Sequence, residues 1–155
     1  MIQRIQTVFL FLATVFAGIL FFTPVFSFNY GGELLKLTIY SVKNANELIS
    51  FSVAYTLPLL LIAALIVAIP AVTIFMYKKR ELQLKLSSLN IFLNAALCGL
   101  IFLFYSSNIE KRVDVESITY LFGTYIPLIN MVLSVLAMRW VKKDIELLKS
   151  VDRLR

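Results

Sequence analysis

The sequence lacks histidine altogether and contains one cysteine, Cys98, in 155 residues. A single cysteine cannot form an intrachain disulfide, and without histidine or further thiols the usual zinc and iron–sulfur ligand sets cannot be assembled. General acid–base chemistry would depend on carboxylates, lysine or tyrosine. No Ser-His-Asp set and no glycine-rich phosphate loop is present. We therefore expect no enzymatic activity, no cofactor and no bound metal.

Acidic residues are missing from the long apolar stretches of the chain. All nine Asp and Glu residues lie in the connections between those stretches or in the C-terminal tail. Proton-coupled transporters and ion channels usually keep an ionisable group at membrane depth. The sequence therefore argues against those two classes of protein.

Charged residues make up only 15% of the chain and hydrophobic residues 60%, and the mean hydropathy is +0.87. A globule of this size could not cover so much apolar surface, whereas a bilayer can. Four apolar stretches reach the roughly 20 residues that cross a bilayer, and inside lipid such stretches must be helical to pair their backbone groups. We predict a single domain, residues 1–155, folded as an all-α bundle of four transmembrane helices. The predicted helices are at about residues 5–26, 51–77, 86–105 and 118–140, with a tail at 141–155.

Lysine and arginine are distributed unequally between the two sides of the predicted bundle. The N-terminus, the loop at 78–85 and the tail from residue 139 hold eleven of them, and the other connections hold four. Basic residues are retained in the cytoplasm, so both termini are predicted to be cytoplasmic. The net charge of +6 lies beside the apolar stretches, which favours the bilayer and its anionic headgroups as partners over nucleic acid. The residues expected to attract anionic headgroups are Lys78, Lys79, Arg80 and Lys85.

The connection after the first stretch carries a pattern that is typical of β-structure. Residues 26–30 and 35–39 alternate between apolar and polar side chains on either side of Gly31-Gly32. Two alternating runs around a glycine pair indicate a hairpin. Residues 111–116 form a weaker candidate for a third strand. We predict a small extracytoplasmic β-hairpin element, with an irregular loop as the alternative.

Three asparagines, Asn90, Asn94 and Asn130, lie inside the predicted helices. An amide in hydrocarbon seeks a hydrogen-bond partner on a neighbouring helix. The simplest interpretation is that Asn94 and Asn130 join the third and fourth helices. The alternative interpretation is a polar ligand pocket between helices.

The tail combines an apolar stripe with mixed charge. Apolar residues recur at helical spacing from Val141 to Leu154, which predicts an amphipathic helix that continues the fourth segment or bends onto the membrane surface. The simplest interpretation of the interleaved charges is a solvated helix face with local ion pairs, each of which is worth little. The alternative interpretation is docking against Gln3-Arg4 or a cytoplasmic partner. The residues expected to carry docking are Arg4, Asp144, Asp152, Arg153 and Arg155.

Both ends of the chain carry distinctive residues. The opening is Met1-Ile2-Gln3-Arg4-Ile5-Gln6-Thr7, and the closing part has Arg139, Lys143-Asp144, Lys149-Ser150 and Asp152-Arg153-Leu154-Arg155. These ends, together with the four-segment hydropathy pattern, resemble the small Bacteroidota membrane proteins grouped as domain of unknown function 4293. The resemblance covers the whole chain and implies an inner-membrane protein of that phylum, but it implies no activity.

These observations lead to two hypotheses about function. The first is a non-enzymatic accessory or scaffold subunit of a membrane assembly, docking through its cytoplasmic ends. The alternative is a binder or carrier of a lipid or other apolar molecule between kinked helices, in a cavity near Pro58 or Pro127.

Overall fold

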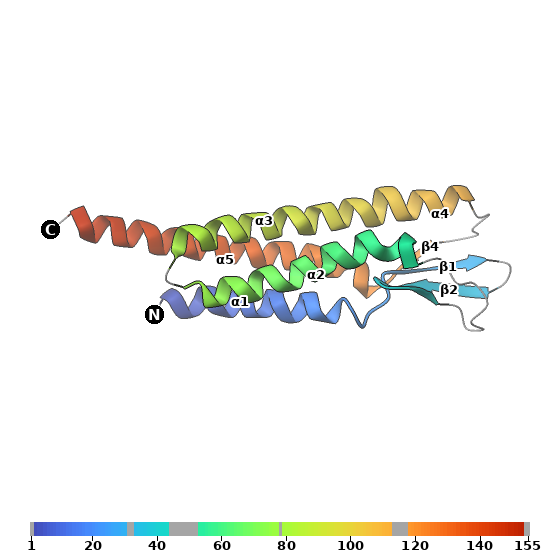
Figure 1. The fold of residues 1–155 in the computed structure, drawn as a ribbon, viewed down its shortest axis with the longest axis horizontal. Helices are drawn as coiled ribbons and strands as arrows, with labels where there is room; N and C mark the ends of the chain where they lie inside the picture. The colour runs from blue at the N-terminus through green and yellow to red at the C-terminus, as the bar shows by residue number, and fades with distance from the viewer. Residues whose placement is uncertain (1, 31–32, 44–52, 78, 113–117, 154–155) are drawn as a thin grey trace.

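The computed structural model describes residues 2–30, 33–43, 53–77, 79–112 and 118–153. Within these residues, long helical rods lie side by side in an elongated bundle, with a small sheet at one end (Figure 1). The start of α1 and the end of α5 lie at the opposite end. We call these two ends the sheet end and the terminal end. The helices are α1 (Ile2–Ile19), α2 (Val53–Phe75), α3 (Arg80–Gly99), η1 (Leu100–Ser106), α4 (Ser107–Arg112) and α5 (Phe122–Arg153).

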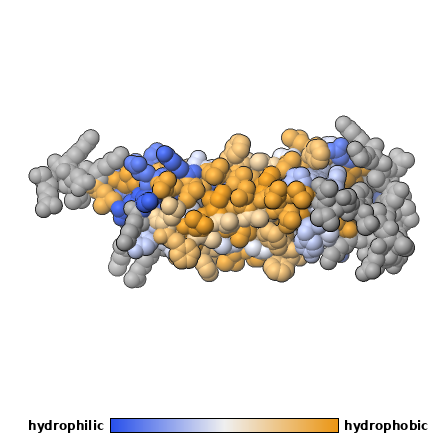
Figure 2. Space-filling view, in the orientation of Figure 1, coloured by the Kyte–Doolittle hydropathy of each residue, from blue (hydrophilic) through white to orange (hydrophobic). Residues whose placement is uncertain are grey.

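Among the described residues, three rods are long and apolar enough to cross a membrane. They contain the stretches Tyr55–Phe75, Arg80–Glu110 and Phe122–Leu148. The first helix has a shorter apolar stretch, Ile5–Ile19, and packs against α2 and α5. Large apolar side chains point outward from the rods, among them Leu103 (78% exposed) and Phe92 (69% exposed). Figure 2 shows an apolar band across the middle of the visible face, with hydrophilic residues toward both ends. Such a band is a surface that lipid covers better than water.

The buried faces of the helices repeat mainly in steps of three and four residues. This spacing packs helices at a shallow left-handed angle, as in four-helix bundles. The buried positions are Gln6, Leu10, Ala13 and Ala17 on α1, with Leu20 directly after its end; Leu59, Ala63, Ile66 and Thr73 on α2; Gln83, Ser87, Asn90, Asn94 and Leu97 on α3; and Ile126, Asn130, Ser134, Ala137 and Val141 on α5. The core is thus apolar toward the sheet end and polar toward the terminal end.

In the part of the chain that the structure describes, the sheet has four strands in the order β3-β2-β1-β4. The strands are β1 (Phe26–Tyr30), β2 (Glu33–Leu37), β3 (Val42–Lys43) and β4 (Ile118–Tyr120). The predicted hairpin is confirmed, because β1 and β2 pair antiparallel with Phe26 opposite Leu37 and Phe28 opposite Leu35. These four side chains are buried. They pack on the helical core. The period-two alternation in the sequence therefore marks the face of the hairpin that is buried against the helices.

The third strand is not where the sequence predicted it. Residues 107–112 form α4, residues 113–117 lie outside the described part, and β4 pairs with β1 from Phe26↔Tyr120 to Phe28↔Ile118. Residues 118–120 were predicted to begin the fourth transmembrane helix, and α5 instead begins at Phe122. Without β4, the outer edge of β1 would have unpaired backbone N–H and C=O groups. Residues 118–120 pair with that edge, which favours a strand over the first turn of a helix.

The other predicted ends shift for identifiable reasons. The first helix ends at Ile19 rather than near residue 26, since Pro24 has no backbone N–H and Phe26 already pairs in the sheet. The third helical rod begins at Arg80 and continues through η1 and α4 to Arg112, so it extends beyond the predicted 86–105 at both ends. The tail continues α5 as one helix to Arg153, which selects the continuing helix over one bent onto the membrane surface.

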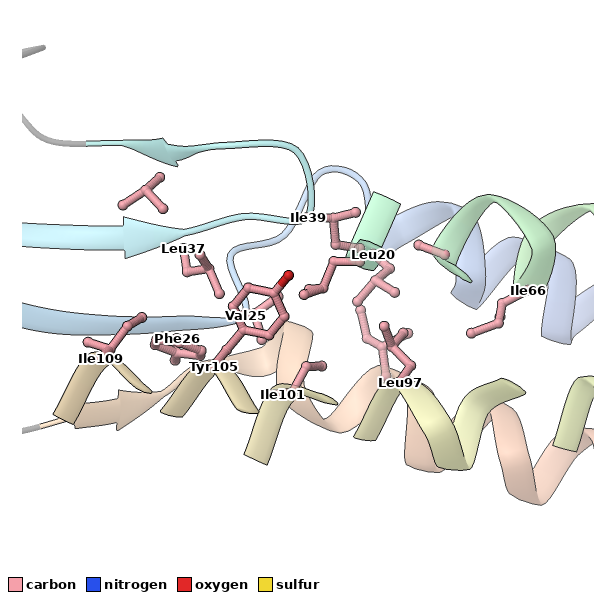
Figure 3. Packing of buried hydrophobic residues seen from close by; sticks show 14 of the residues in the cluster. Leu20, Val25, Phe26, Leu37, Ile39, Ile66, Leu97, Ile101, Tyr105 and Ile109 are labelled. Atoms are coloured by element: carbon pink, nitrogen blue, oxygen red, sulfur yellow. The ribbon is translucent and has the colours of Figure 1, made fainter. Parts of the chain in front are cut away.

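A π-helical turn fits the third rod to the core at the sheet end. Ile101, Tyr105 and Ile109 are all buried although they lie four residues apart. In an α-helix such steps would rotate away from the core, and the wider turns of η1 keep these side chains facing it. The Tyr105 hydroxyl donates a hydrogen bond to the backbone oxygen of Tyr55 at 2.6 Å. Figure 3 shows the Tyr105 ring beside Val25 and Phe26, so this turn joins the helices to the sheet.

Candidate functional site at the terminal end

An ion pair links the beginning of α3 to α5. The Arg80 Nε donates to the Asp144 Oδ2 at 2.5 Å, and both side chains are partly buried. Arg80 is the first residue of α3, so this pair marks the level at which α3 begins along α5. A partly buried, charge-assisted contact of this kind holds two helix ends in register better than a fully exposed pair would.

A second polar contact fixes the register of the same two helices. The Asn90 Nδ2 donates to the Ser134 Oγ at 2.8 Å. Asn90 lies ten residues after Arg80, and Ser134 lies ten residues before Asp144, so α3 and α5 run antiparallel in one uninterrupted register. The same register brings Asn94 level with Asn130. The helices are joined by Asn90 and Ser134, and not by the Asn94–Asn130 pair that the sequence suggested.

Further polar side chains line the core between these contacts. We call this set the polar seam; its members are Gln83, Ser87, Asn90 and Asn94 on α3 and Asn130 and Ser134 on α5, all buried. The Gln83 Nε2 donates to the backbone oxygen of Thr73 on α2 at 3.0 Å. The Asn94 Nδ2 donates to the backbone oxygen of Asn90 at 2.8 Å. The seam therefore connects α3 to both α2 and α5.

Several polar atoms of the seam have no protein partner within the described part of the chain. They are the Gln83 Oε1, the Ser87 Oγ, the Asn90 Oδ1, the Asn94 Oδ1 and both polar atoms of the Asn130 side chain. Gln6 on α1 likewise has both polar side-chain atoms buried without a partner. Each such atom costs about 1–3 kcal/mol when left dry. An interior of this composition is suited to hydrogen-bonding small polar guests such as water.

The seam contains no ionisable side chain. Its amides and hydroxyls can donate and accept hydrogen bonds, but they cannot take up or release a proton at neutral pH. Within the described residues no group of three or more His, Cys, Asp and Glu side chains is placed to hold a metal ion. The chemistry available here is recognition and helix pairing.

A surface hollow lies beside the Arg80–Asp144 pair, between α3 and α5. Its cavity volume is about 340 Å³, and its lining residues are Glu81, Leu84, Lys85, Lys142, Ile145 and Glu146. A second hollow, of about 370 Å³, is lined by Phe75, Met76, Tyr77 and Lys79 at the end of α2. The residues that line both hollows come from the end of α2, the connection to α3, the first turns of α3 and the last part of α5, and these segments lie toward the terminal end (Figure 1).

The last part of α5 extends beyond the other helices. Since Asp144 lies beside the first residue of α3, the nine residues 145–153 continue past the start of α3. At 1.5 Å per residue this overhang is about 14 Å long. Figure 1 shows it projecting past α1 and α2 as well. Leu147 and Leu148 on the overhang are exposed, so its apolar side chains are not used by the bundle.

No curated protein matches the chain. A family model described as domain of unknown function (DUF4293) matches residues 2–154. The chain belongs to the DUF4293 family. The resemblance drawn from its two ends is thereby confirmed, and the family description assigns no activity to this DUF4293 protein.

The structure separates the residues that the sequence grouped for docking. Asp144 is paired with Arg80. Arg4 lies on α1, and Asp152 and Arg153 lie on the overhang of α5, but the structure does not describe their side chains; Arg155 is outside the described residues. The docking role of these residues in the DUF4293 protein stays a prediction.

The residues predicted to attract anionic headgroups are separated in the same way. Lys79 is exposed and lines the hollow at the end of α2, and Lys85 is exposed and lines the hollow between α3 and α5. Arg80 is engaged with Asp144, and Lys78 is outside the described residues. Contact between lipid headgroups and these positions of the DUF4293 protein stays a prediction. Of the four residues, Lys79 and Lys85 are the ones that the structure describes as exposed.

Sequence reasoning found three members of the polar seam and missed the other three. Asn90, Asn94 and Asn130 were recognised as single polar residues, whereas Gln83, Ser87 and Ser134 were not selected. Their signal was available, because positions 83, 87, 90 and 94 follow the same three-and-four spacing as the apolar core positions of α3. In this DUF4293 protein the members of the polar seam can be identified from their spacing along the helix, whereas their residue types alone do not identify them.

Proposed function

We propose that this DUF4293 protein is a non-enzymatic accessory or scaffold subunit of an assembly in the bacterial inner membrane. In this proposal α1 crosses the bilayer together with the three longer rods, and the terminal end faces the cytoplasm. The charge distribution supports that orientation, because the terminal end carries most of the lysines and arginines. The lack of ionisable groups in the polar seam supports a role other than catalysis.

The observation that carries the proposal is the overhang of α5. A helix that serves only to span a membrane has no physical need for two further turns beyond its neighbours. An isolated helical end of nine residues is marginally stable in water without packing partners. Leu147 and Leu148 on this overhang are exposed, and an apolar, mixed-charge helix is suited to packing against a partner helix.

The experiment is co-purification from the native membrane in mild detergent through an N-terminal tag. The full chain is compared with a chain truncated after Glu146, which removes the overhang beyond its first two residues but keeps the Arg80–Asp144 pair and both hollows. We expect one stoichiometric protein partner with the full chain and its loss on truncation, with an unchanged melting temperature for the bundle. Recovery of the same partner by both chains would overturn the proposed docking role of the overhang.

A matched pair of point variants tests the same surface without truncation. Leu148→Asp changes a leucine that is 41% exposed on the overhang, and Leu34→Asp changes one that is 54% exposed at the sheet end. We expect Leu148→Asp to weaken partner recovery at least tenfold and Leu34→Asp to leave it unchanged. Equal effects of the two variants would indicate general detergent sensitivity and refute a specific docking site.

The alternative function, a carrier of apolar molecules between the helices, requires a cavity near Pro58 or Pro127. The two hollows described at the terminal end are lined by neither proline. Next to Pro58 the core positions Leu59 and Ala63 are fully buried, and Pro127 is itself buried beside Ile126. Where the structure describes them, the residues beside both prolines are packed into the core, which gives the carrier proposal no support.

A further inference from the structure

The hollow between α3 and α5 has two similar walls. On α3 the wall is formed by Glu81, Leu84 and Lys85, and on α5 by Lys142, Ile145 and Glu146. Each wall presents residues three and four apart, which lie on one face of a helix. An apolar side chain stands in the middle of each wall, with a carboxylate and an ammonium group on either side of it along the helix.

The charges of the hollow are ordered by depth. Because α3 and α5 are antiparallel, Lys85 lies deeper toward the apolar band than Glu81, and Lys142 lies deeper than Glu146. On each wall the separation is four residues, or about 6 Å along the helix axis. None of these four side chains has an ion-pair partner within the described ranges. By the α3–α5 register Lys142 is level with Leu82, so the order from the apolar band outward is Lys85, Lys142, Glu81 and Glu146, with Lys142 and Glu81 at nearly the same level. The hollow is basic at its membrane side and acidic at its outer side.

The same hollow lies at the level of a membrane–water boundary. By the α3–α5 register, Trp140 is level with Leu84, and Tyr77 at the end of α2 is exposed. Tryptophan and tyrosine gather where hydrocarbon meets headgroups. A group entering this hollow from the bilayer would first meet Lys85 and Lys142, and then Glu81 and Glu146.

We propose that the hollow binds the headgroup of a phospholipid that ends in a primary amine, as in phosphatidylethanolamine. The lipid phosphate lies next to the glycerol and is held by Lys85 and Lys142. The ammonium group lies farther from the bilayer and donates hydrogen bonds to Glu81 and Glu146. The cavity volume of about 340 Å³ is in the range of small-molecule sites, and Leu84 and Ile145 provide apolar contact for the headgroup linker.

The acidic side chains make this site selective. A headgroup with a net negative charge, as in phosphatidylglycerol, would place hydroxyl groups beside the two carboxylates and gain no ion pair with them. The trimethylammonium of phosphatidylcholine has no N–H group to donate. The hollow shares only Ile145 and Glu146 with the overhang, and the leucines proposed for docking, Leu147 and Leu148, are not among its lining residues.

The test titrates the purified full-length protein in detergent with tail-labelled phosphatidylethanolamine, phosphatidylcholine and phosphatidylglycerol of identical acyl chains. We expect phosphatidylethanolamine to bind most tightly. The double variant Lys85→Gln with Lys142→Gln should weaken its binding about 20- to 30-fold, because each interfacial lysine contributes roughly fivefold. The double variant Glu81→Gln with Glu146→Gln should transfer the preference to phosphatidylglycerol.

The control is Lys143→Gln, which removes a neighbouring exposed lysine that stands over the Trp140 ring and not in the hollow. It should bind all three lipids as the wild type does, and circular dichroism should show equal helix content in every variant. Equal binding of the three lipids by the wild type would overturn the proposal. A preference unchanged by the glutamate variant would also overturn it, as would variants that alter only the oligomeric state and thereby reveal a second copy over the hollow.

Discussion

Replacing Gly123 by alanine adds one methyl group where the start of α5 approaches the chain between α1 and β1. A Cβ at this position would lie 2.5 Å from the Pro24 backbone oxygen, 2.9 Å from the Pro24 carbonyl carbon and 3.1 Å from the Val25 Cα. All three are backbone atoms, so no side chain can rotate away. Overpacking of this kind costs about 1–3 kcal/mol. The substitution should therefore destabilise the contact between α5 and the sheet.

Hydrogen bonds at the same corner add to the cost. The backbone N–H of Gly123 donates to the Pro24 oxygen at 3.2 Å, and that of Leu121 donates to the Val25 oxygen at 2.9 Å. The Thr124 hydroxyl also donates to the Val25 oxygen, at 2.5 Å. Moving the two segments apart weakens bonds worth about 1 kcal/mol each, whereas alanine regains up to about 1 kcal/mol of helix propensity. The net expectation is a loss of about 2 kcal/mol.

Gly99→Ala and Gly18→Ala are the matched controls, because a Cβ at either glycine meets nothing within 4 Å. Both glycines lie within helices, so these variants should be neutral or stabilised by up to about 1 kcal/mol. The assay is thermal unfolding in mild detergent followed by circular dichroism. For a chain of this size Gly123→Ala should lower the melting temperature by about 4–8 °C. A melting temperature for Gly123→Ala at or above that of the controls would refute the close approach.

Two further predictions concern the contacts between α3 and α5. Ala substitution of Asn90 and Ser134, singly and together, should give a coupling energy of about 0.6–2 kcal/mol in a double-mutant cycle, because one donates a hydrogen bond to the other; a coupling near zero would contradict this contact. Arg80→Gln and Asp144→Asn should be coupled by about 0.5–1 kcal/mol, since their ion pair is partly buried. That coupling should decrease in high salt, and simple additivity at low salt would show that the pair is not formed.

Much of the fold follows from local patterns in the sequence. The helical rods were predictable because a long apolar run in a bilayer must pair its backbone groups internally. The β1–β2 hairpin was predictable because its period-two alternation surrounds Gly31-Gly32. The ends of the elements were less predictable. Strand β4 forms from the beginning of an apolar run because the edge of β1 offers it a partner far away in the sequence.

The candidate site was predictable only in part. The sequence showed that the amides of α3 and α5 need partners and that basic residues gather at one end. It could not show that Arg80 and Asp144, 64 positions apart, neutralise each other. It also could not show that Lys85 and Lys142 line one hollow. A count of charges along the sequence treats each of these residues as unpaired. It therefore assigns them to separate connections and does not show which of them lie together in the fold.

The sequence by itself determined the kind of protein: apolar helical rods, a polar end rich in lysine and arginine, and a small hairpin at the other end. These properties depend on the hydropathy of short stretches and on backbone hydrogen bonds between residues close in the sequence. Both can be predicted from local sequence. Only the tertiary structure decided which polar groups meet, because the register of α3 against α5 places residues tens of positions apart at the same level. That register is set by the packing of whole helix faces, and no short segment contains it.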